Sequence, residues 1–439
     1  GKSPSSRRFR SSRCARLDRV CDTVSSMTRS LLLSFLALAA LASAQPAYDL
    51  LLKGGHVIDP KNNRDGVMDV AIAGGKIAKV APSINASEAR RTVDVKGLYV
   101  SPGFIDLHVH VFLTDTPAGM SASVQPDAFS FRSGTTTMVD AGSAGSKTFA
   151  EFRRRIIDRA QTRVLALLNI AAGGMGTGKE DDLAGLDADL AIRTANQHKD
   201  VIVGFKSAHF GGPGWESIDA AVKASKATKM PVMVDFGYLN KVRNLRTLLE
   251  DKLQAGDIYT HCYSGHREEI LENGKINPAM INGRKRGIFF DLGFGAGSFY
   301  WYVALPLTQQ GFWPDSISTD LHTGSMNGGM KDMANTAGKI LSMGAPLAKV
   351  IDMCTWTPAK EIKRTDLGNL DVGAEADITV LRVDTGKFGY TDSAGAGHQG
   401  TKAIVPEITL RKGRVMWDLN ARAAENWKTF QYKKRRWEK

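Results

Sequence analysis

Pro102-Gly-Phe-Ile-Asp-Leu-His-Val-His110 is an apolar stretch that ends in two histidines one residue apart. A short apolar run of this kind predicts a buried strand. Because side chains alternate along a strand, His108 and His110 face the same side and can both reach a cation beyond the strand's end. Neutral imidazole binds zinc and similar metals. Such a pair also arises by chance, so its meaning depends on the rest of the chain.

The N-terminal residues have the pattern of a secretory signal peptide. Met27-Thr-Arg precedes an apolar run from Leu31 to Leu41, which is too short to span a bilayer, and Ala42-Ser-Ala44 follows it. We therefore expect a signal peptide at 27–44 and an exported protein, periplasmic or secreted. Residues 1–26 do not begin with Met and are rich in Ser and Arg, so we interpret them as a leader outside the folded protein.

The composition is that of a globular protein, with 439 residues, 43% of them hydrophobic and 23% charged. A basic cluster, Lys433-Lys-Arg-Arg436, lies in the C-terminal tail at 421–439. No nucleic-acid motif accompanies it, so we expect a solvated tail and no nucleic-acid partner. Beyond the predicted signal peptide, the cysteines are Cys262 and Cys354, and their spacing matches neither a disulfide framework nor a cysteine-based zinc site.

Both ends of the mature chain contain short alternating runs separated by glycine turns, which is typical of antiparallel strands. These runs lie at 49–53, 57–59, 68–73, 76–80, 92–95, 377–381, 407–411 and 414–417. The pattern predicts a small β-sandwich built from residues 45–101 and 366–420.

The long middle segment, 102–365, alternates short apolar runs with amphipathic segments of helix length. The apolar runs lie at 104–107, 135–139, 164–170, 201–205, 231–236, 257–259, 287–290 and 316–319, and the clearest helical segments at 149–159, 217–229 and 245–253. Eight buried strands with intervening helices predict an α/β fold of the (β/α)8 TIM-barrel type. A doubly wound open sheet is the competing topology.

Polar residues follow several of the predicted strands. Lys206 ends the fourth apolar run, Asp235 the fifth, His261 the sixth and Asp320 the eighth. Each has an ordinary structural explanation on its own, since a lysine can extend from a barrel mouth, an aspartate can cap a helix and a histidine can lie in a core. Because the active site of such a barrel collects at the carboxyl ends of its strands, the set and the histidine pair together favour a metal site.

The histidine pair after Pro-Gly-Phe-Ile-Asp, the strand-four lysine, the strand-six histidine and the strand-eight aspartate, in this order, resemble the amidohydrolase superfamily. The resemblance extends from about Tyr48 to Asn420. The chain also resembles the deacetylase branch of this superfamily, which is related to dihydroorotases and D-aminoacylases. The supporting stretches lie at 140–145, 256–265, 290–299 and 315–322.

The resemblance implies a site for one or two divalent metal ions, with zinc as the expected metal. His108 and His110 would bind the buried metal, with Asp320 as a further ligand. Lys206, carboxylated by carbon dioxide, would bridge two metals, because an unmodified ammonium cannot ligate a cation. His261 would bind the second metal. A shared hydroxide would attack the substrate carbonyl, while Asp320 takes its proton and passes it to the leaving group.

Two positions depart from this pattern. Relatives with two metals carry a histidine at the end of strand five, where this chain has Asp235, and Phe294 stands where a histidine is expected in near relatives. Asp235 can bind zinc through oxygen, but its shorter reach leaves the position and affinity of the second metal open. We expect His209 to be a substitute ligand or a substrate contact. His322, two residues after Asp320, is expected to contact substrate or to form a structural hydrogen bond.

These observations predict a metal-dependent hydrolase that cleaves an amide or ester bond of a small N-acyl or O-acyl acid, of the deacetylase or aminoacylase type. A cyclic amidase of the dihydroorotase or hydantoinase type is the alternative enzyme. A ligand-binding barrel with a degraded metal site is the alternative outside catalysis. The expected partner is a small acyl substrate. No stable membrane span is expected after removal of the signal, and assembly into a homo-oligomer is left open.

Overall fold

The computed structural model describes residues 46–113, 123–175, 180–235, 237 and 239–433. The predicted leader at 1–26, the predicted signal peptide at 27–44 and most of the basic C-terminal cluster lie outside the described residues. From Tyr48 onward the chain forms one unit. None of the described helices has the length and apolar character needed to cross a bilayer.

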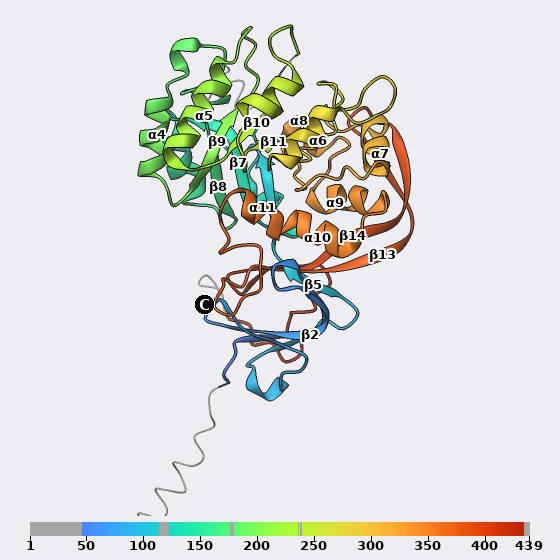
Figure 1. The fold of residues 1–439 in the computed structure, drawn as a ribbon. Coiled ribbons are helices and arrows are strands. Elements are labelled where there is room, and N and C mark those ends of the chain that lie inside the picture. The colour runs from blue at the N-terminus through green and yellow to red at the C-terminus, as the bar shows by residue number, and fades with distance from the viewer. Residues whose placement is uncertain (1–45, 114–122, 176–179, 236, 238, 434–439) are drawn as a thin grey trace, which may run out of the picture. The chain divides into compact units, whose positions relative to one another are not determined.

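Seven parallel strands form one sheet among the described residues, and they pair in the order in which they occur in the chain (Figure 1). A doubly wound sheet reverses its strand order at one point. This sheet does not, so the pairing excludes the doubly wound alternative and fits a half-barrel. The strands are β6 (Phe104–Val109), β7 (Thr135–Gly145), β8 (Arg163–Asn169), β9 (Ile202–Ser207), β10 (Val232–Val234), β11 (Ile258–Tyr259) and β12 (Phe289–Phe290).

The eighth predicted strand is irregular. Ser316 bridges Asp291, just beyond β12, and Leu321 bridges Val109 of β6, both in parallel orientation. Asp320 has a left-handed backbone, with φ of 48°, which does not continue a strand. The segment 316–321 therefore meets both edges of the parallel sheet through single bridges instead of a continuous ladder.

Helices connect successive strands. The predicted helix at 217–229 is confirmed as α5, whereas those at 149–159 and 245–253 contain π-helical segments, Arg153–Ile157 and Thr247–Lys252. The α-helices are α3 (Phe149–Phe152), α4 (Ala188–Gln197), α5 (Glu216–Thr228), α6 (Pro278–Lys285), α7 (Trp301–Gln309), α8 (Thr323–Met326), α9 (Met333–Ser342), α10 (Leu347–Cys354) and α11 (Trp356–Glu361).

Alternation along β6 separates apolar core from polar residues. Ile105 and Leu107 belong to an apolar cluster that includes residues of α11. The residues between and after them, Asp106 and His108, point to the other face. Asp106 accepts hydrogen bonds from the Thr319 backbone N–H at 3.0 Å and from the Thr319 hydroxyl at 2.6 Å. The same strand thus packs the core on one side and fixes the irregular eighth segment on the other.

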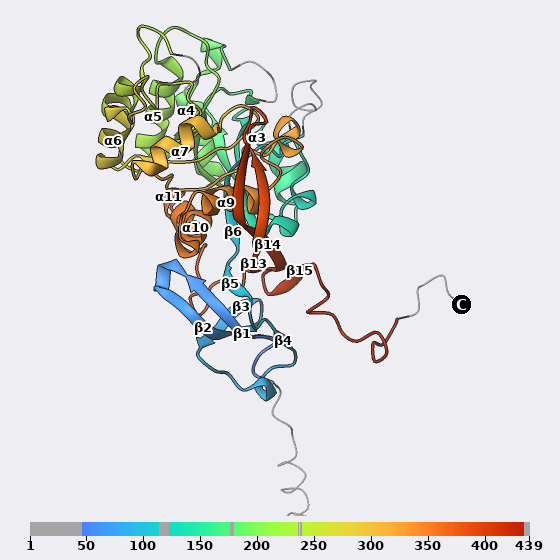
Figure 2. The same ribbon diagram turned by 90° about the vertical axis from the view of Figure 1, so that its right-hand side faces the viewer.

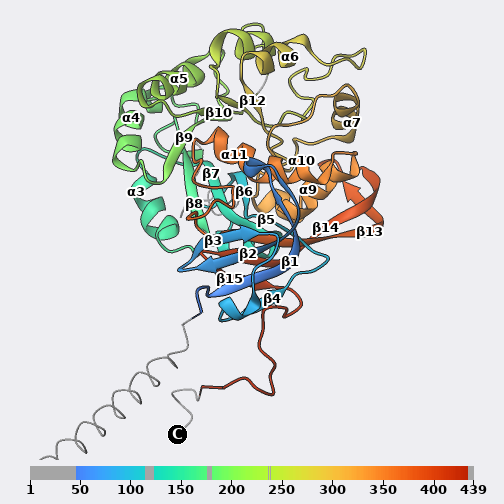
Figure 3. The same ribbon diagram turned by 60° about the horizontal axis from the view of Figure 1, so that its bottom comes forward.

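Strands from both ends of the chain form a second sheet, of eight strands in the described part (Figure 3). The sequence predicted a small β-sandwich built from both chain ends. Strands from both ends do come together, and hydrogen bonding joins them into one sheet, because β5 lies between β1 and β13 and pairs with both. The strands are β1 (Leu50–Asp59), β2 (Arg64–Ala73), β3 (Lys76–Ala81), β4 (Thr92–Asp94), β5 (Tyr99–Pro102), β13 (Ile378–Thr391), β14 (Gly397–Arg411) and β15 (Arg414–Asp418).

β13 and β14 form a long antiparallel hairpin that extends past α9 (Figure 2). At its tip, the Ser393 N–H donates to the Phe299 carbonyl at 3.0 Å. The Trp301 N–H donates to Asp392 Oδ2 at 3.3 Å. The hairpin therefore ties the C-terminal part of the chain to the loop that follows the last strand of the parallel sheet.

A partly buried ionic cluster links the two sheets. Arg163, at the start of β8, lies 2.6 Å from Asp377 and also contacts Glu375, both just before β13. Arg411, at the end of β14, lies 3.1 Å from Asp377 and 3.0 Å from Glu375. Asp377 is 8% exposed and accepts from both guanidinium groups.

Replacing Asp377 tests this link. We expect Asp377→Ala to lower the free energy of unfolding by about 3 kcal/mol or more, because it leaves two partly buried guanidinium groups short of a carboxylate. Asp366→Ala is the control: Asp366 pairs with Arg364 at the surface and should cost no more than about 1 kcal/mol. Urea unfolding followed by circular dichroism compares the two variants, and equal losses would contradict the structural role of Asp377.

Candidate functional site

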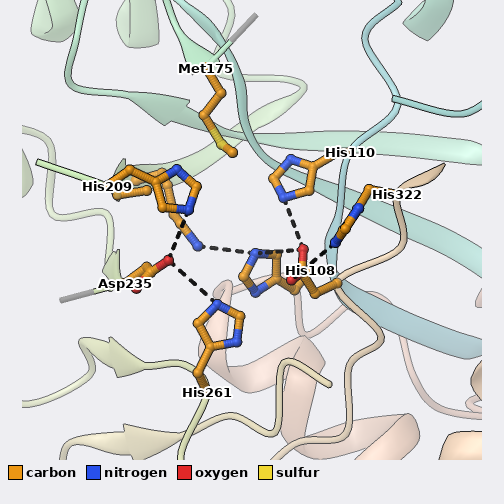
Figure 4. A pocket seen from close by; sticks show the side chains of 10 residues that line it. His108, His110, Met175, His209, Asp235, His261 and His322 are labelled. Atoms are coloured by element: carbon orange, nitrogen blue, oxygen red, sulfur yellow. Dashed lines mark hydrogen bonds and ion pairs between the residues drawn. The ribbon is translucent and has the colours of Figure 1, made fainter. Parts of the chain in front are cut away.

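The residues that the sequence singled out as ligands or substrate contacts line one cavity of about 250 Å³ (Figure 4). The cavity lies where the parallel strands end, because these residues belong to a strand or to the 316–321 segment, or follow one of them closely. Its lining residues are His108, His110, Met175, Lys206, Ala208, His209, Asp235, His261, Asp320 and His322.

His108 carries its ring proton on Nδ1. That nitrogen lies 3.0 Å from Thr260 Oγ1, and the Thr260 hydroxyl donates to Asp291 Oδ2 at 2.7 Å. Since a hydroxyl has a single proton, Thr260 can only accept from His108. Burial lowers the pKa of His108 well below its ordinary value, which favours the neutral ring. The Nε2 lone pair therefore faces the cavity, as metal ligation requires.

Asp320 lies beside the histidine pair as a carboxylate. Its Oδ1 is 3.0 Å from His110 Nε2 and 3.5 Å from His108 Nε2. Burial alone would raise the pKa of Asp320, but the two imidazoles hold it well below its usual range. A Cβ at Gly295 would lie 2.5 Å from Asp320 Oδ2, so a glycine is needed where this loop passes the carboxylate.

Lys206 extends from β9 into the cavity and is 1% exposed. Its Nζ lies 3.1 Å from His108 Nε2. A Cβ at Gly142 of β7 would lie 2.8 Å from Lys206 Cγ, so the glycine makes room for the lysine stem. Burial lowers the pKa of Lys206, and the charges of nearby carboxylates, Asp235 first, oppose this shift.

The ring of His261 is fixed by the backbone. Its Nδ1 donates to the Gly293 carbonyl at 2.6 Å, which leaves Nε2 for the cavity. A Cβ at Gly293 would lie 2.7 Å from His261 Nδ1. His261 has a left-handed φ of 63°, a conformation that is uncommon outside glycine and that concentrates at functional sites.

Asp235 forms an ion pair with Arg267, which the sequence did not single out. The Arg267 guanidinium contacts Asp235 Oδ1, and both side chains are buried. Asp235 Oδ2 lies 3.3 Å from His209 Nε2 and 3.5 Å from His261 Nε2. Burial alone would raise the pKa of Asp235, but the charge of Arg267 and the neighbouring histidines hold it well below its usual range.

His209 lies at the mouth of the cavity, with its side chain 54% exposed. Its Nδ1 lies 3.1 Å from Glu180 Oε2, and Asn169 donates to Glu180 Oε1 at 2.8 Å. Hydrogen bonding to Asp235 and then to Glu180 raises the pKa of His209 to about 10. Sequence reasoning missed Glu180, since only the fold brings it to this ring.

His322 differs from the other cavity histidines in its ring protonation. The Gly324 N–H donates to His322 Nδ1 at 3.0 Å, so that nitrogen carries no proton. Burial lowers the pKa of His322, and the single proton of the neutral ring therefore lies on Nε2. This Nε2 lies 3.8 Å from Asp320 Oδ2. An N–H in this position suits a hydrogen bond to a substrate oxygen and does not suit metal ligation.

The donor set fits a divalent metal. The ligand atoms of His108, His261 and Asp320 lie within 4.8 Å of one another. Imidazole nitrogen and carboxylate oxygen are donors that zinc binds. His108 and His261 each give Nδ1 to a fixed acceptor, which is the outer arrangement found around metal-bound histidine. The cavity can therefore hold a metal whose chemistry would act on a small bound molecule.

Comparison with known proteins agrees with this geometry. Residues 304–413 match the amidohydrolase family. A deacetylase of Agrobacterium fabrum is 34% identical over 337 residues, which cover 74% of this chain and 81% of the relative. The crystal structure of an adenine deaminase has a TM-score of 0.77 at 31% identity, over 84% of this chain and 100% of that chain. The crystal structure of a dihydroorotase has a TM-score of 0.73 at 30% identity, over 83% and 98%.

The resemblance seen in the sequence is thereby confirmed, and these relatives cover 74% to 84% of this chain. Amidohydrolases generally use divalent metals, which agrees with the donor set of the cavity. The chain therefore belongs to the amidohydrolase superfamily and is a hydrolase that acts on carbon–nitrogen bonds.

Proposed function

We propose that this chain is a metal-dependent deacylase that hydrolyses the amide or ester bond of a small N-acyl or O-acyl acid. The observation that carries the proposal is the convergence of five strand-end side chains on one cavity: His108, His110, Lys206, His261 and Asp320. The deacetylase relative, aligned over most of its length, supports the same class of reaction. A cavity of about 250 Å³ suits a small substrate.

The resemblance to the amidohydrolase superfamily assigns the proposed metal ligands. His108, His110 and Asp320 would hold the buried metal, and His261 and Asp235 would serve a second one. Lys206, carboxylated, would bridge the two. Zinc is the metal we expect with this nitrogen and oxygen donor set. When bound, such ions lower the pKa of a water and polarise a carbonyl.

The remaining steps belong to the chain's own residues. Asp320 is proposed to take the proton of the attacking water and to pass it to the leaving nitrogen or oxygen. Its left-handed backbone and its contact with His110 hold the carboxylate in place. His322, through its Nε2–H, is proposed to donate to the carbonyl or carboxylate oxygen of the substrate.

A cyclic amidase is the second candidate, because the solved dihydroorotase structure is similar over almost its full length. Both candidates use the same proposed metal ligands. They differ in the substrate, since one requires an open acyl chain and the other a ring whose amide lies inside it.

A substrate panel separates these candidates. Protein beginning at Gln45 and supplied with zinc and bicarbonate would be assayed with N-acetyl amino acids and O-acetyl hydroxy acids of both hands, and with dihydroorotate, hydantoin and adenine. We expect kcat/KM for at least one acyl acid to exceed that for every ring compound by about 100-fold or more. Turnover of a ring compound alone would favour the cyclic amidase.

Replacing Asp320 tests the proton transfer. We expect Asp320→Asn to lower kcat on the best substrate by about 10²–10⁴-fold, because the amide cannot accept the proton of the water. The circular dichroism spectrum and the thermal midpoint should stay close to those of the unaltered protein. Retention of most of the activity would rule out the proposed role of Asp320.

Thr260→Val tests the support of His108. Valine has nearly the same shape but removes the hydroxyl that accepts from His108 and donates to Asp291. We expect metal affinity to fall about 10–100-fold, measured by competition with a chromophoric chelator. Thr308→Val is the matched control, because that buried hydroxyl bonds only carbonyls within α7. An equal effect of both substitutions would contradict the role given to Thr260.

A further inference from the structure

Three ligand atoms converge on one side of the cavity, apart from the His110 and Asp320 pair. They are Asp235 Oδ2, His209 Nε2 and His261 Nε2, and both contacts of the carboxylate oxygen are drawn in Figure 4. Each side chain comes from a different strand end: His209 follows β9, Asp235 follows β10 and His261 follows β11. The convergence is thus a product of the fold.

The two contacts of Asp235 Oδ2 have the spacing of ligand atoms around one ion. In a tetrahedral shell with bonds of about 2.0–2.2 Å, neighbouring ligand atoms lie about 3.3–3.6 Å apart. Asp235 Oδ2 lies 3.3 Å from His209 Nε2 and 3.5 Å from His261 Nε2. Both distances therefore fit ligand atoms that share a cation, and without a metal the same contact is the hydrogen bond between His209 and Asp235.

The Nδ1 contacts of His209 and His261 also support metal ligation. His209 directs Nδ1 to Glu180, which Asn169 holds in turn, and His261 directs Nδ1 to the Gly293 carbonyl. Both acceptors are of the kind that orients metal-bound histidine. At His209 a metal would take the place of the Nε2 proton that faces Asp235.

His322 supplies a contrast within the same cavity. Its Nδ1 accepts a backbone N–H, so its cavity-facing Nε2 must carry the proton of the neutral ring. His322 is therefore suited to a substrate contact, whereas the contacts of His209 suit ligation.

Arg267 selects the oxygen of Asp235 that remains available. The guanidinium and the Gly237 N–H both bond to Oδ1, the latter at 3.3 Å. Oδ2 is left facing the two histidines. The aspartate is thereby held in one orientation, which offsets its short reach compared with a histidine side chain.

We propose that His209 is a ligand of a second metal, together with Asp235 and His261, and so replaces the histidine that is missing at the end of β10. The inference rests on the proposed function, because it requires that the cavity binds metal. Of the two roles expected for His209 it selects that of a ligand, and it names Glu180 as the positioning residue of His209.

Metal stoichiometry tests the proposal without reference to activity. Protein purified with zinc and bicarbonate and dialysed should hold about two equivalents by elemental analysis. His209→Ala and His209→Gln should each hold about one, because the sites around His108 and His110 are untouched. His322→Ala is the matched control, since it removes another cavity histidine, and it should retain about two. Retention of one equivalent by the His209 variants also shows that they fold.

Two further variants sharpen the test. In the double variant His209→Ala, Asp235→His, the second equivalent should return, because a histidine is restored at the end of β10. Glu180→Gln should weaken only the second site, by about 10–100-fold. With Mn²⁺ in place of zinc, the electron paramagnetic resonance signal of a coupled ion pair should be present in the unaltered protein and absent in His209→Ala.

The failures of the two proposals can be told apart. If His209→Ala keeps about two equivalents, His209 is not a ligand, and the proposed hydrolase remains. If the unaltered protein holds about one equivalent, the second site is absent and a mononuclear hydrolase remains. If it holds none under these conditions, both proposals fail.

Discussion

Parallel pairing of β6 to β12 is the constraint on which the rest of the site depends. Because parallel strands end at the same edge, each residue just beyond a strand arrives beside its counterparts from the neighbouring strands. Asp291 strengthens this arrangement, since its carboxylate accepts from Thr260 after β11 and from Ser316 and Ser318 of the irregular eighth segment. One buried carboxylate therefore sets the distance between these elements and, through Thr260, the orientation of His108.

Charged side chains surround Asp235, which stands at the end of β10 where a histidine was expected from the family resemblance. A buried aspartate without compensation would favour protonation. Arg267 prevents this, and Glu180 adds a second carboxylate on the far side of His209. The charges near Asp235 are thus distributed over four side chains, those of Asp235, Arg267, His209 and Glu180. A histidine at the end of β10 would be a single neutral group. Such a centre differs in its electrostatics from one built on histidines alone, and that difference bears on the metal it prefers.

The strand-end residues could be predicted from the sequence because the signal is local: alternation along β6 and a polar residue after several of the apolar runs. The pairing of strands from the two chain ends in a single sheet could not be predicted from the sequence. β5 and β13 are far apart in the chain, and neither apolar run contains a signal that specifies its partner strand. Arg267 and Glu180 were missed for the same reason, as both lie in loops whose positions follow from the fold. Phe294 stands where a histidine is expected in near relatives. In this structure its ring lies in the apolar core and stacks on Phe299, with ring centroids 4.6 Å apart.

The pairing of β5 with β13 has a consequence for how the protein is made. β5 and the strands before it leave the ribosome long before β13, so the edge of β5 stays unpaired during most of synthesis. An unpaired edge is a template for association with other chains. The tip of the β13–β14 hairpin also bonds to residues 299–301, which follow the last strand of the parallel sheet. The part of the chain that contains the cavity therefore reaches its final form only after the hairpin has emerged. A chain that stops before β13 would therefore be prone to aggregation, and not merely less active.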